Sequence, residues 1–171
     1  MIVVLFRHGP AGTRDAERWP DDRRRPLSER GVIRTRAAAG GLTRCVEGTP
    51  RILTSPLVRC ASTADLLRET FGLADAPETL AALAPGGAAR DTLRRLTELR
   101  DEDLVILVGH EPDLGSFAGV LVFGAPTALP LKKAGACAVR FDGAPKAGGG
   151  VLQWLLPPRA LRALGRKKSR A

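Results

Sequence analysis

The segment VVLFRHGPA, residues 3–11, joins an apolar run to an abrupt polar end. Uninterrupted apolar residues over this length are typical of a strand buried on both faces, as in a parallel sheet. The run stops at Arg7-His8-Gly9, so a cation and an imidazole directly follow the strand. Ligands of open α/β sheets bind beyond the carboxyl ends of the strands, and this segment therefore predicts both a fold class and the place of a site.

Other segments predict strands that alternate with helices. Further strands are expected at residues 51–55 (RILTS) and 104–109 (LVILVG), and weaker ones near 78–80, 136–141 and 151–155. Helices are expected at about 28–43, 56–71, 89–99 and 112–123, with Ser55 as the cap of the second and prolines at two of the starts. This alternation predicts an α/β protein, a three-layer sandwich with a mostly parallel central sheet flanked by helices.

The composition predicts one folded domain followed by a basic segment. The 171 residues are 44% apolar, enough for a sizeable core. The formal charge is +9, and residues 159–171 carry six basic residues and no acidic one. We expect a domain over residues 1–158 and a solvated basic tail over 159–171, with contact to nucleic acid or another polyanion as the alternative role of the tail.

The cysteines indicate an intracellular protein. Cys45, Cys60 and Cys137 are odd in number and lack the C-x-x-C spacing. The opening apolar run, MIVVLF, is too short for a secretory or membrane-spanning segment. We therefore expect reduced thiols, a cytoplasmic location and no membrane partner.

Cationic and imidazole groups follow three of the predicted strands. Arg7 and His8 follow the first, Arg59 lies one turn past the second, and His110 follows residues 104–109. Both histidines of the chain are in this set, and predicted helix starts would add free backbone N–H groups nearby. The sequence thus predicts a phosphate-sized anion site. Two histidines without clustered cysteines or carboxylates are a poor ligand set for zinc, so no metal and no cofactor is expected.

Two other phosphatase signatures match by spelling alone. Residues 45–51, CVEGTPR, fit C-x5-R, and residues 101–105, DEDLV, fit D-x-D-x-V. The first would need a strand before its cysteine, where a helix is predicted. The second needs its acids after a strand, where they precede one. Both therefore fail on structural context.

Four motifs in order resemble the histidine phosphatase (phosphoglycerate-mutase-like) superfamily, and within it the short SixA-type phosphohistidine phosphatases. The motifs are Arg7-His8-Gly9, Arg25-Pro26-Leu27-Ser28-x-x-Gly31, Ser55-Pro56-x-x-Arg59-x-x-x-Thr63 and Gly109-His110-Glu111-Pro112, with a late Lys132-Lys133-x-Gly135 segment. The resemblance covers roughly residues 1–158 and implies the phosphoglycerate-mutase-like fold.

The resemblance also implies roles for individual residues. His8 would be the nucleophile that becomes phosphorylated and is then hydrolysed. Arg7 and Arg59 would hold the phosphoryl oxygens and lower the pKa of His8, and His110 would donate a further hydrogen bond. Four more residues are expected to bind substrate: Gly9, Arg25, Ser55 and Glu111.

A dedicated general acid is not evident in the sequence. Larger superfamily members carry an acidic residue before the third strand region, where only Glu78 lies close. Glu111, Asp15 and Glu17 are the other candidates, each also readable as a cap or surface charge. Without a strong acid, a substrate with an easily departing group such as phosphohistidine is favoured over an alkyl phosphate.

The predicted function is therefore metal-independent phosphate hydrolysis through phospho-His8, with a phosphorylated histidine-containing protein as the expected partner. One alternative keeps the chemistry and changes the substrate to a small phosphoester, a nucleotide or polyphosphate. Another is a non-catalytic module that binds phosphate or nucleic acid through the pocket or the tail. Nucleic acid is the less favoured partner, because the tail lacks interleaved aromatic residues.

Overall fold

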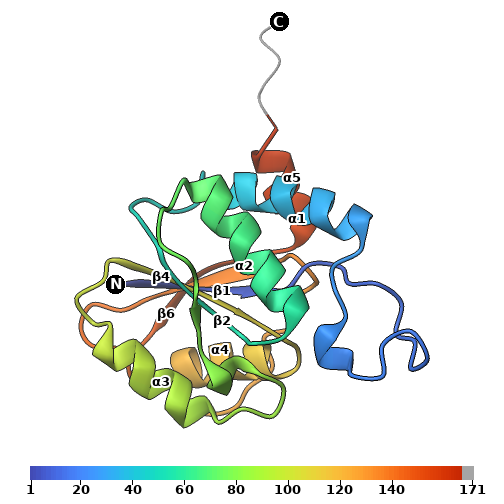
Figure 1. Ribbon diagram of the computed structural model, residues 1–171. Coiled ribbons are helices and arrows are strands. Elements are labelled where there is room, and N and C mark those ends of the chain that lie inside the picture. Colours follow the sequence, from blue (N-terminus) through green and yellow to red (C-terminus); the bar gives the residue numbers. More distant parts are fainter. Residues whose placement is uncertain (167–171) are drawn as a thin grey trace, which may run out of the picture.

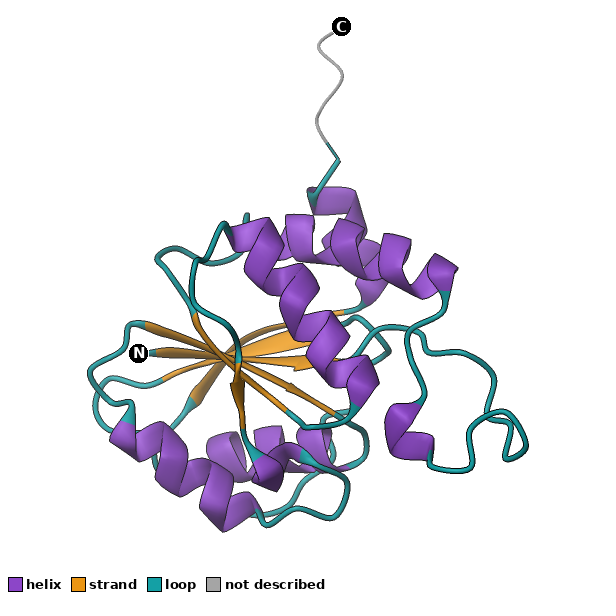
Figure 2. Cartoon of the chain, in the orientation of Figure 1, coloured by secondary structure: helices purple, strands orange, loops and turns teal. Residues whose placement is uncertain are grey.

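The computed structural model describes residues 1–166 of the chain. A six-stranded sheet forms the middle of three layers (Figures 1 and 2). Its strands are β1 (Ile2–Arg7), β2 (Arg51–Thr54), β3 (Glu78–Thr79), β4 (Leu104–Gly109), β5 (Ala136–Arg140) and β6 (Val151–Leu156), in the order β3-β2-β4-β1-β5-β6. The first four strands pair in parallel, and β5 is antiparallel to both β1 and β6. The predicted α/β class with a mostly parallel sheet is confirmed.

Helices cover both faces of the sheet, as short right-handed crossovers require. The helices are α1 (Glu29–Leu42), α2 (Val58–Phe71), α3 (Ala89–Glu98), α4 (Asp113–Phe123) and α5 (Pro158–Leu164), with short 3-10 turns η1 (Asp22–Arg24) and η2 (Ala81–Leu83). Figure 1 shows α1, α2 and α5 on one face and α3 and α4 on the other.

The opening strand is apolar throughout because each face of the sheet has its own core. Val4 and Phe6 pack with residues of α1 and α2, while Val3 and Leu5 pack with residues of α3 and α4. All four side chains are fully buried. Burial of each contributes about 1.5–3 kcal/mol, so β1 is anchored from both sides.

The strand register places the ends of β1, β2 and β4 side by side. Arg7 pairs with Gly109 and Thr54 with Val108. The pattern continues one residue further, because the N–H of His8 donates to the Gly109 carbonyl (3.1 Å) and that of Ser55 to the Val108 carbonyl (3.0 Å). His8, Ser55 and His110 are thereby held at one edge of the sheet, as the sequence predicted.

The start of α2 corrects a prediction. We expected Ser55 to cap this helix with Pro56 in its first turn, but the helix begins at Val58 and its N-cap, Leu57, makes no side-chain cap bond. The Ser55 hydroxyl contacts His110 instead.

The boundary of the tail is also corrected. The basic tail was expected from Arg159 onward, yet Pro158–Leu164 form α5, and Leu161 is fully buried in the core beside α1. The alternation of arginine with Ala and Leu in this segment is that of a short amphipathic helix. Residues 167–171, with the remaining basic residues of the predicted tail, lie outside the described residues.

Candidate active site

The two histidines of the chain face each other at the edge of the sheet. Their ring centroids are 5.1 Å apart, and the planes are inclined by 57°. Both residues are buried, with 6% of His8 and 4% of His110 exposed. They come from adjacent strands, so the backbone of the sheet rather than a mobile loop fixes their separation.

The hydrogen bond of His8 determines which ring nitrogen carries the proton. Its Nδ1 lies 2.7 Å from the carbonyl oxygen of Gly9. A carbonyl can only accept, so we assign the proton to Nδ1. Nε2 is then left with a free lone pair, which is the electronic state required of a nucleophile.

Burial keeps His8 neutral. The pKa of His8 is lowered to about 3, mainly by burial and also by the nearby His110, Arg59 and Arg7, while the bond to Gly9 opposes the shift. The protonated form would have to lose its hydration next to two guanidinium groups. His8 is therefore uncharged and nucleophilic at neutral pH.

Arg7 and Arg59 each use one end of the guanidinium to fix its position. Nη1 of Arg7 donates to the Leu131 carbonyl (2.8 Å), and Nη1 of Arg59 donates to the carbonyl of Asp22 (2.8 Å). Their buried Nε–H groups have no hydrogen-bond partner among the described residues. Burial lowers the pKa of both arginines, although both remain cations. Unpaired buried donors on two cations are expected where an anion binds.

His110 is held by a serine and a cysteine. Its Nε2 lies 2.9 Å from Oγ of Ser55 and 3.3 Å from Sγ of Cys60. Burial raises the pKa of the Cys60 thiol to about 12, so the thiol keeps its proton. The Ser55 Oγ already accepts the N–H of Leu57 (3.4 Å), which leaves its own proton for donation. Both neighbours can thus donate to Nε2, and we assign the His110 proton to Nδ1.

His110 is neutral for the same reason as His8. Burial lowers the pKa of His110 to about 4, with contributions from Arg59 and Arg7, and the Asp113 and Asp22 carboxylates oppose the shift. A neutral imidazole with its proton on Nδ1 is a hydrogen-bond donor on that side.

Asp22, which the sequence does not mark as a site residue, pairs with two arginines of the motifs. One of its carboxylate oxygens lies 2.7 Å from Nε of Arg25, and the other lies 3.2 Å from Nη1 of Arg59. The hydrogen bond from Arg25, with the charges of Arg59 and Arg14, lowers the pKa of Asp22 to about 2. Arg25 also donates to the Gly12 carbonyl (2.8 Å), so it binds the loop before α1 to the site. Substrate binding by Arg25 stays a prediction.

Glu111 holds the residue that positions Arg7. Its Oε1 accepts the N–H of Leu131 (3.2 Å), the residue whose carbonyl holds Arg7. Burial raises the pKa of Glu111, and the Leu131 and Arg7 interactions oppose the rise. The peptide of Leu131 thus links Glu111 to Arg7. Direct contact of Glu111 with substrate stays a prediction.

Two glycines of the motifs are required by close packing. A Cβ on Gly9 would lie 2.0 Å from Oγ1 of Thr35, and one on Gly31 would lie 1.9 Å from the carbonyl oxygen of Pro10. The strand end and the first turn of α1 can touch only because neither residue has a side chain. The Gly9 N–H donates to Thr63 (3.0 Å), and a contact of Gly9 with substrate stays a prediction.

The carboxyl groups of the other candidate general acids are bonded elsewhere or exposed. Glu78 pairs with Arg95 (2.7 Å) and Arg51 (3.1 Å), and these bonds lower its pKa. Asp15 accepts backbone N–H groups of its own loop. Glu17 is exposed. Asp113, which the sequence does not mark as a candidate, lines the cavity beside His110 and accepts the N–H of Gly86 (2.8 Å).

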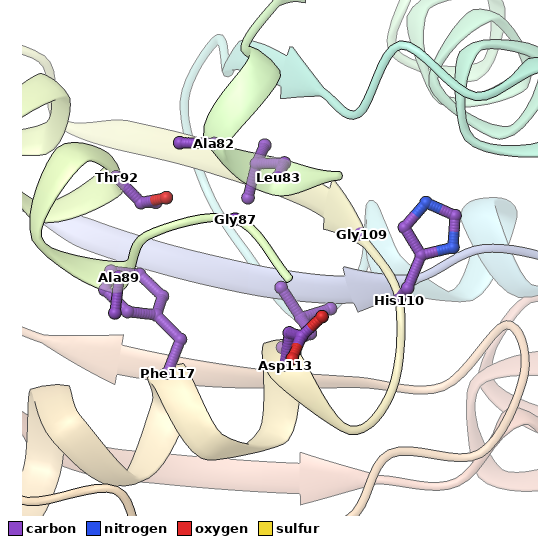
Figure 3. Close-up of a pocket in the computed structure, with 10 residues that line it drawn as sticks. Ala82, Leu83, Gly87, Ala89, Thr92, Gly109, His110, Asp113 and Phe117 are labelled. Atoms are coloured by element: carbon purple, nitrogen blue, oxygen red, sulfur yellow. The ribbon is translucent and has the colours of Figure 1, made fainter. Parts of the chain in front are cut away.

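A small cavity lies behind His110, between η2, α3 and α4 (Figure 3). Thr92, Leu83 and Phe117 line it, and the His110 ring lies at its rim. Its volume of about 30 Å³ has room for one or two water molecules and not for a phosphorylated side chain. This cavity is therefore too small to be the phosphate site that the sequence predicts.

Two kinds of feature are absent from residues 1–166. Within that range no helix is long and apolar enough to cross a membrane. The same residues contain no group of three or more His, Cys, Asp or Glu side chains arranged to hold a metal ion.

Comparison with known proteins gives the family. Residues 3–84 match the model described as "Histidine phosphatase superfamily (branch 1)". An uncharacterized protein of Picosynechococcus sp. is 37% identical over 143 residues, 82% of this chain and 85% of that protein. Among solved structures, the protein histidine phosphatase SixA complexed with tungstate has a TM-score of 0.79 and 28% identity, covering 94% of this chain and 99% of the other.

More distant structures share the fold alone. The putative phosphohistidine phosphatase SixA of Nakamurella multipartitia has a TM-score of 0.72 at 24% identity, covering 92% of this chain and 95% of that chain. A mycobacterial glucosyl-3-phosphoglycerate phosphatase has a TM-score of 0.67 at 18% identity, covering 91% and 99%. With its family match, its close relative and this architecture, the chain belongs to the histidine phosphatase superfamily as a phosphatase with the phosphoglycerate-mutase-like fold.

Proposed function

We propose that this phosphatase removes the phosphoryl group from phosphohistidine in proteins through a covalent phosphohistidine on His8. The observation that supports the proposal most strongly is the pair of unpartnered Nε donors of Arg7 and Arg59 beside the free Nε2 lone pair of His8. These groups provide two cations for the phosphoryl oxygens and one nucleophile for the phosphorus atom.

In the first step the Nε2 lone pair of His8 attacks phosphorus. The P–N bond to the substrate imidazole breaks, and its electron pair returns to the substrate nitrogen. Arg7, Arg59 and the Nδ1–H of His110 stabilise the charge on the phosphoryl oxygens during transfer. The imidazole product leaves as a neutral molecule when its other nitrogen carries a proton.

In the second step water attacks the phosphoryl group on His8. The new P–N bond breaks, inorganic phosphate is released, and Nε2 regains its lone pair. Nδ1 stays bonded to the Gly9 carbonyl throughout and keeps the ring oriented.

The absence of an uncommitted carboxyl group among the described site residues favours this substrate. Transfer between two imidazoles breaks and makes the same kind of bond, so no strong acid is needed. An alkoxide leaving group would need a proton from the enzyme. Asp22 has its pKa lowered to about 2 and is bonded to two arginines, so it is a poor donor. The SixA structure with 28% identity is named as a protein histidine phosphatase, which agrees with the proposal.

The test is to trap the intermediate. The protein is mixed with a ³²P-labelled phosphohistidine protein, quenched in alkaline detergent and separated on a gel. We expect label on the wild type and on His110→Asn, which forms it more slowly, and none on His8→Ala. Label on another residue, or full turnover by His8→Ala, would contradict the proposed nucleophile.

A substrate panel tests the finer part of the proposal. The value of kcat/KM is measured for the phosphohistidine protein, p-nitrophenyl phosphate and inorganic polyphosphate. We expect the phosphohistidine protein to be the best substrate. Preference for either of the others would overturn the substrate assignment and leave the His8 chemistry in place.

A further inference from the structure

The turn from Leu131 to Gly135 is fastened across the end of β1. The N–H of Ala134 donates to the carbonyls of Arg7 (3.1 Å) and His8 (3.2 Å), and the N–H of Arg7 donates to the Gly135 carbonyl (3.0 Å). The Arg7 guanidinium bonds the Leu131 carbonyl in addition. The backbone of this turn is therefore positioned as firmly as the nucleophile itself.

The turn also holds a strained residue. Ala134 has φ of 58°, and it is the only non-glycine residue with positive φ among residues 1–166. This conformation costs an alanine about 1–2 kcal/mol. Its side chain is buried in the core beside Phe6, so packing keeps the turn in this shape. Backbone strain next to a site indicates that the turn has a function there.

Lys133 is the residue that the turn presents to the site. Its side chain is exposed, and its backbone lies between Leu131, which accepts a bond from the Arg7 guanidinium, and Ala134, which donates to the Arg7 and His8 carbonyls. Partial loss of hydration and the charges of Arg7, Arg25 and Arg59 lower the pKa of Lys133. Among the described residues no hydrogen bond or ion pair is made by the Lys133 side chain.

The side chains around the phosphoryl position carry a net positive charge. Five cations are present, Arg7, Arg14, Arg25, Arg59 and Lys133, against the three carboxylates of Asp22, Glu111 and Asp113. Both imidazoles are neutral near pH 7. The net charge of about +2 matches a phosphoryl dianion, which carries about −2 above its second pKa near 6. Without Lys133 the match is lost.

We propose that Lys133 is a substrate-binding residue whose ammonium group contacts the phosphoryl dianion held by Arg7 and Arg59. The proposal rests on the anion site of the proposed function and adds a contact to it. Lys133 thereby makes the site select the dianion over the monoanion of the same phosphate.

The neighbouring Lys132 offers a matched control. Both lysines are exposed on the same turn and carry the same charge, so the pair tests position rather than charge. Binding of inorganic phosphate and of tungstate to the wild type, Lys133→Met, Lys132→Met and Lys133→Arg is measured by calorimetry at pH 8. We expect about a 10-fold loss of affinity for Lys133→Met, less than a 2-fold change for Lys132→Met, and affinity within about 3-fold of wild type for Lys133→Arg.

The pH dependence adds a second readout. Wild-type affinity for phosphate should rise between pH 6 and pH 8 as the dianion forms, and this rise should be smaller in Lys133→Met. Equal losses for Lys132→Met and Lys133→Met would show a diffuse charge effect and overturn the proposal, as would unchanged binding by Lys133→Met. The melting temperature of each variant shows that the turn is intact.

These measurements need no turnover. A Lys133-dependent anion site in a protein that does not hydrolyse phosphohistidine would refute the proposed function and leave this inference standing. Full activity of the wild type on phosphohistidine, with unchanged anion binding by Lys133→Met, would support the proposed function and refute the role of Lys133.

Discussion

Two clusters of cations in this molecule are built from the same residue type and behave in opposite ways. In the structural cluster, Arg51 and Arg95 surround Glu78, and Arg95 also pairs with Glu98 (2.9 Å). In the site cluster, Arg7 and Arg59 lie near Lys133 and are only partly neutralised. The carboxylates raise the pKa of Arg95, whereas burial lowers the pKa of both Arg7 and Arg59.

The difference shows what marks a binding site in an arginine-rich protein. Arginine content alone does not separate the clusters. Buried Nε–H groups without partners do not separate them either, because Arg51 has one as well as Arg7 and Arg59. The site cluster is distinguished by positive charge in excess of local carboxylates. Such an arrangement lowers the stability of the folded protein slightly. Binding of an anion offsets this loss of stability.

The largest effect expected of the site cluster is on proton affinity. The pKa of His8 is lowered from an ordinary 6.5 to about 3, which is roughly three orders of magnitude in proton binding. The chain has two histidines, so long-range ¹H–¹⁵N NMR of the untagged protein resolves both rings. We expect midpoints below pH 5 for both, with His8 protonated on Nδ1. Titration of both rings near pH 6.5 would contradict the described environment.

The same shifts predict how stability depends on pH. The unfolded chain binds protons on these imidazoles near pH 6.5, and the folded chain only near pH 3 for His8 and pH 4 for His110. This contribution to the free energy of unfolding is therefore fully present above pH 6.5 and is lost as the pH falls toward 4. Urea unfolding at pH 8, 6.5 and 5 measures it, and a variant lacking both imidazoles should show a flatter profile.

The next effect separates the two clusters by mutation. Arg59→Met removes a cation that faces the transferring phosphoryl group, so kcat/KM should fall by about 100- to 1000-fold. Stability should change little, because a buried and incompletely paired charge is lost. Steady-state kinetics and thermal unfolding of the same preparation provide both values. A fall in kcat/KM below 5-fold would remove Arg59 from the phosphoryl site.

A smaller effect is expected at Ser55. Ser55→Ala removes the hydroxyl beside Nε2 of His110 and leaves only the Cys60 thiol there. The ring then loses part of its preference for the Nδ1–H form, and kcat should fall about 10-fold with little change in KM. The ¹⁵N shifts of His110 should move toward those of a mixture of tautomers. Unchanged ¹⁵N shifts would exclude a role of Ser55 in orienting this ring.

The smallest effect on activity is expected in the structural cluster. Arg95→Met removes the partner of two carboxylates far from the phosphoryl position. We expect kcat/KM within 2-fold of wild type and a melting temperature lower by about 2–4 °C, the result of a loss near 1 kcal/mol. A large loss of activity would mean that the two clusters are coupled.

Residues with a strong local signal could be predicted from the sequence. The apolar runs around Val4 and Ile106 identified two central strands, because only a doubly covered sheet buries such runs completely. The register of β1 with β4 then brings His8 to His110, and parallel strands with polar residues at their ends already imply this.

The rest depended on tertiary contacts that local sequence does not encode. Asp22 looks like one more charge in a polar, arginine-rich loop, and only the fold of that loop places it against Arg59. The signal that could have found it is its position three residues before Arg25, with which it pairs. The Pro56 that follows Ser55 favours a helix cap there, whereas the Ser55 hydroxyl faces a histidine 55 residues away. Lys133 was visible only as part of a motif.

A crystal structure with bound tungstate tests the central claim most directly. The account predicts one tetrahedral anion between the two imidazoles, with His8 facing it through Nε2 and with the guanidiniums of Arg7 and Arg59 on its oxygens. An anion bound elsewhere, or one facing Nδ1 of His8, would contradict it.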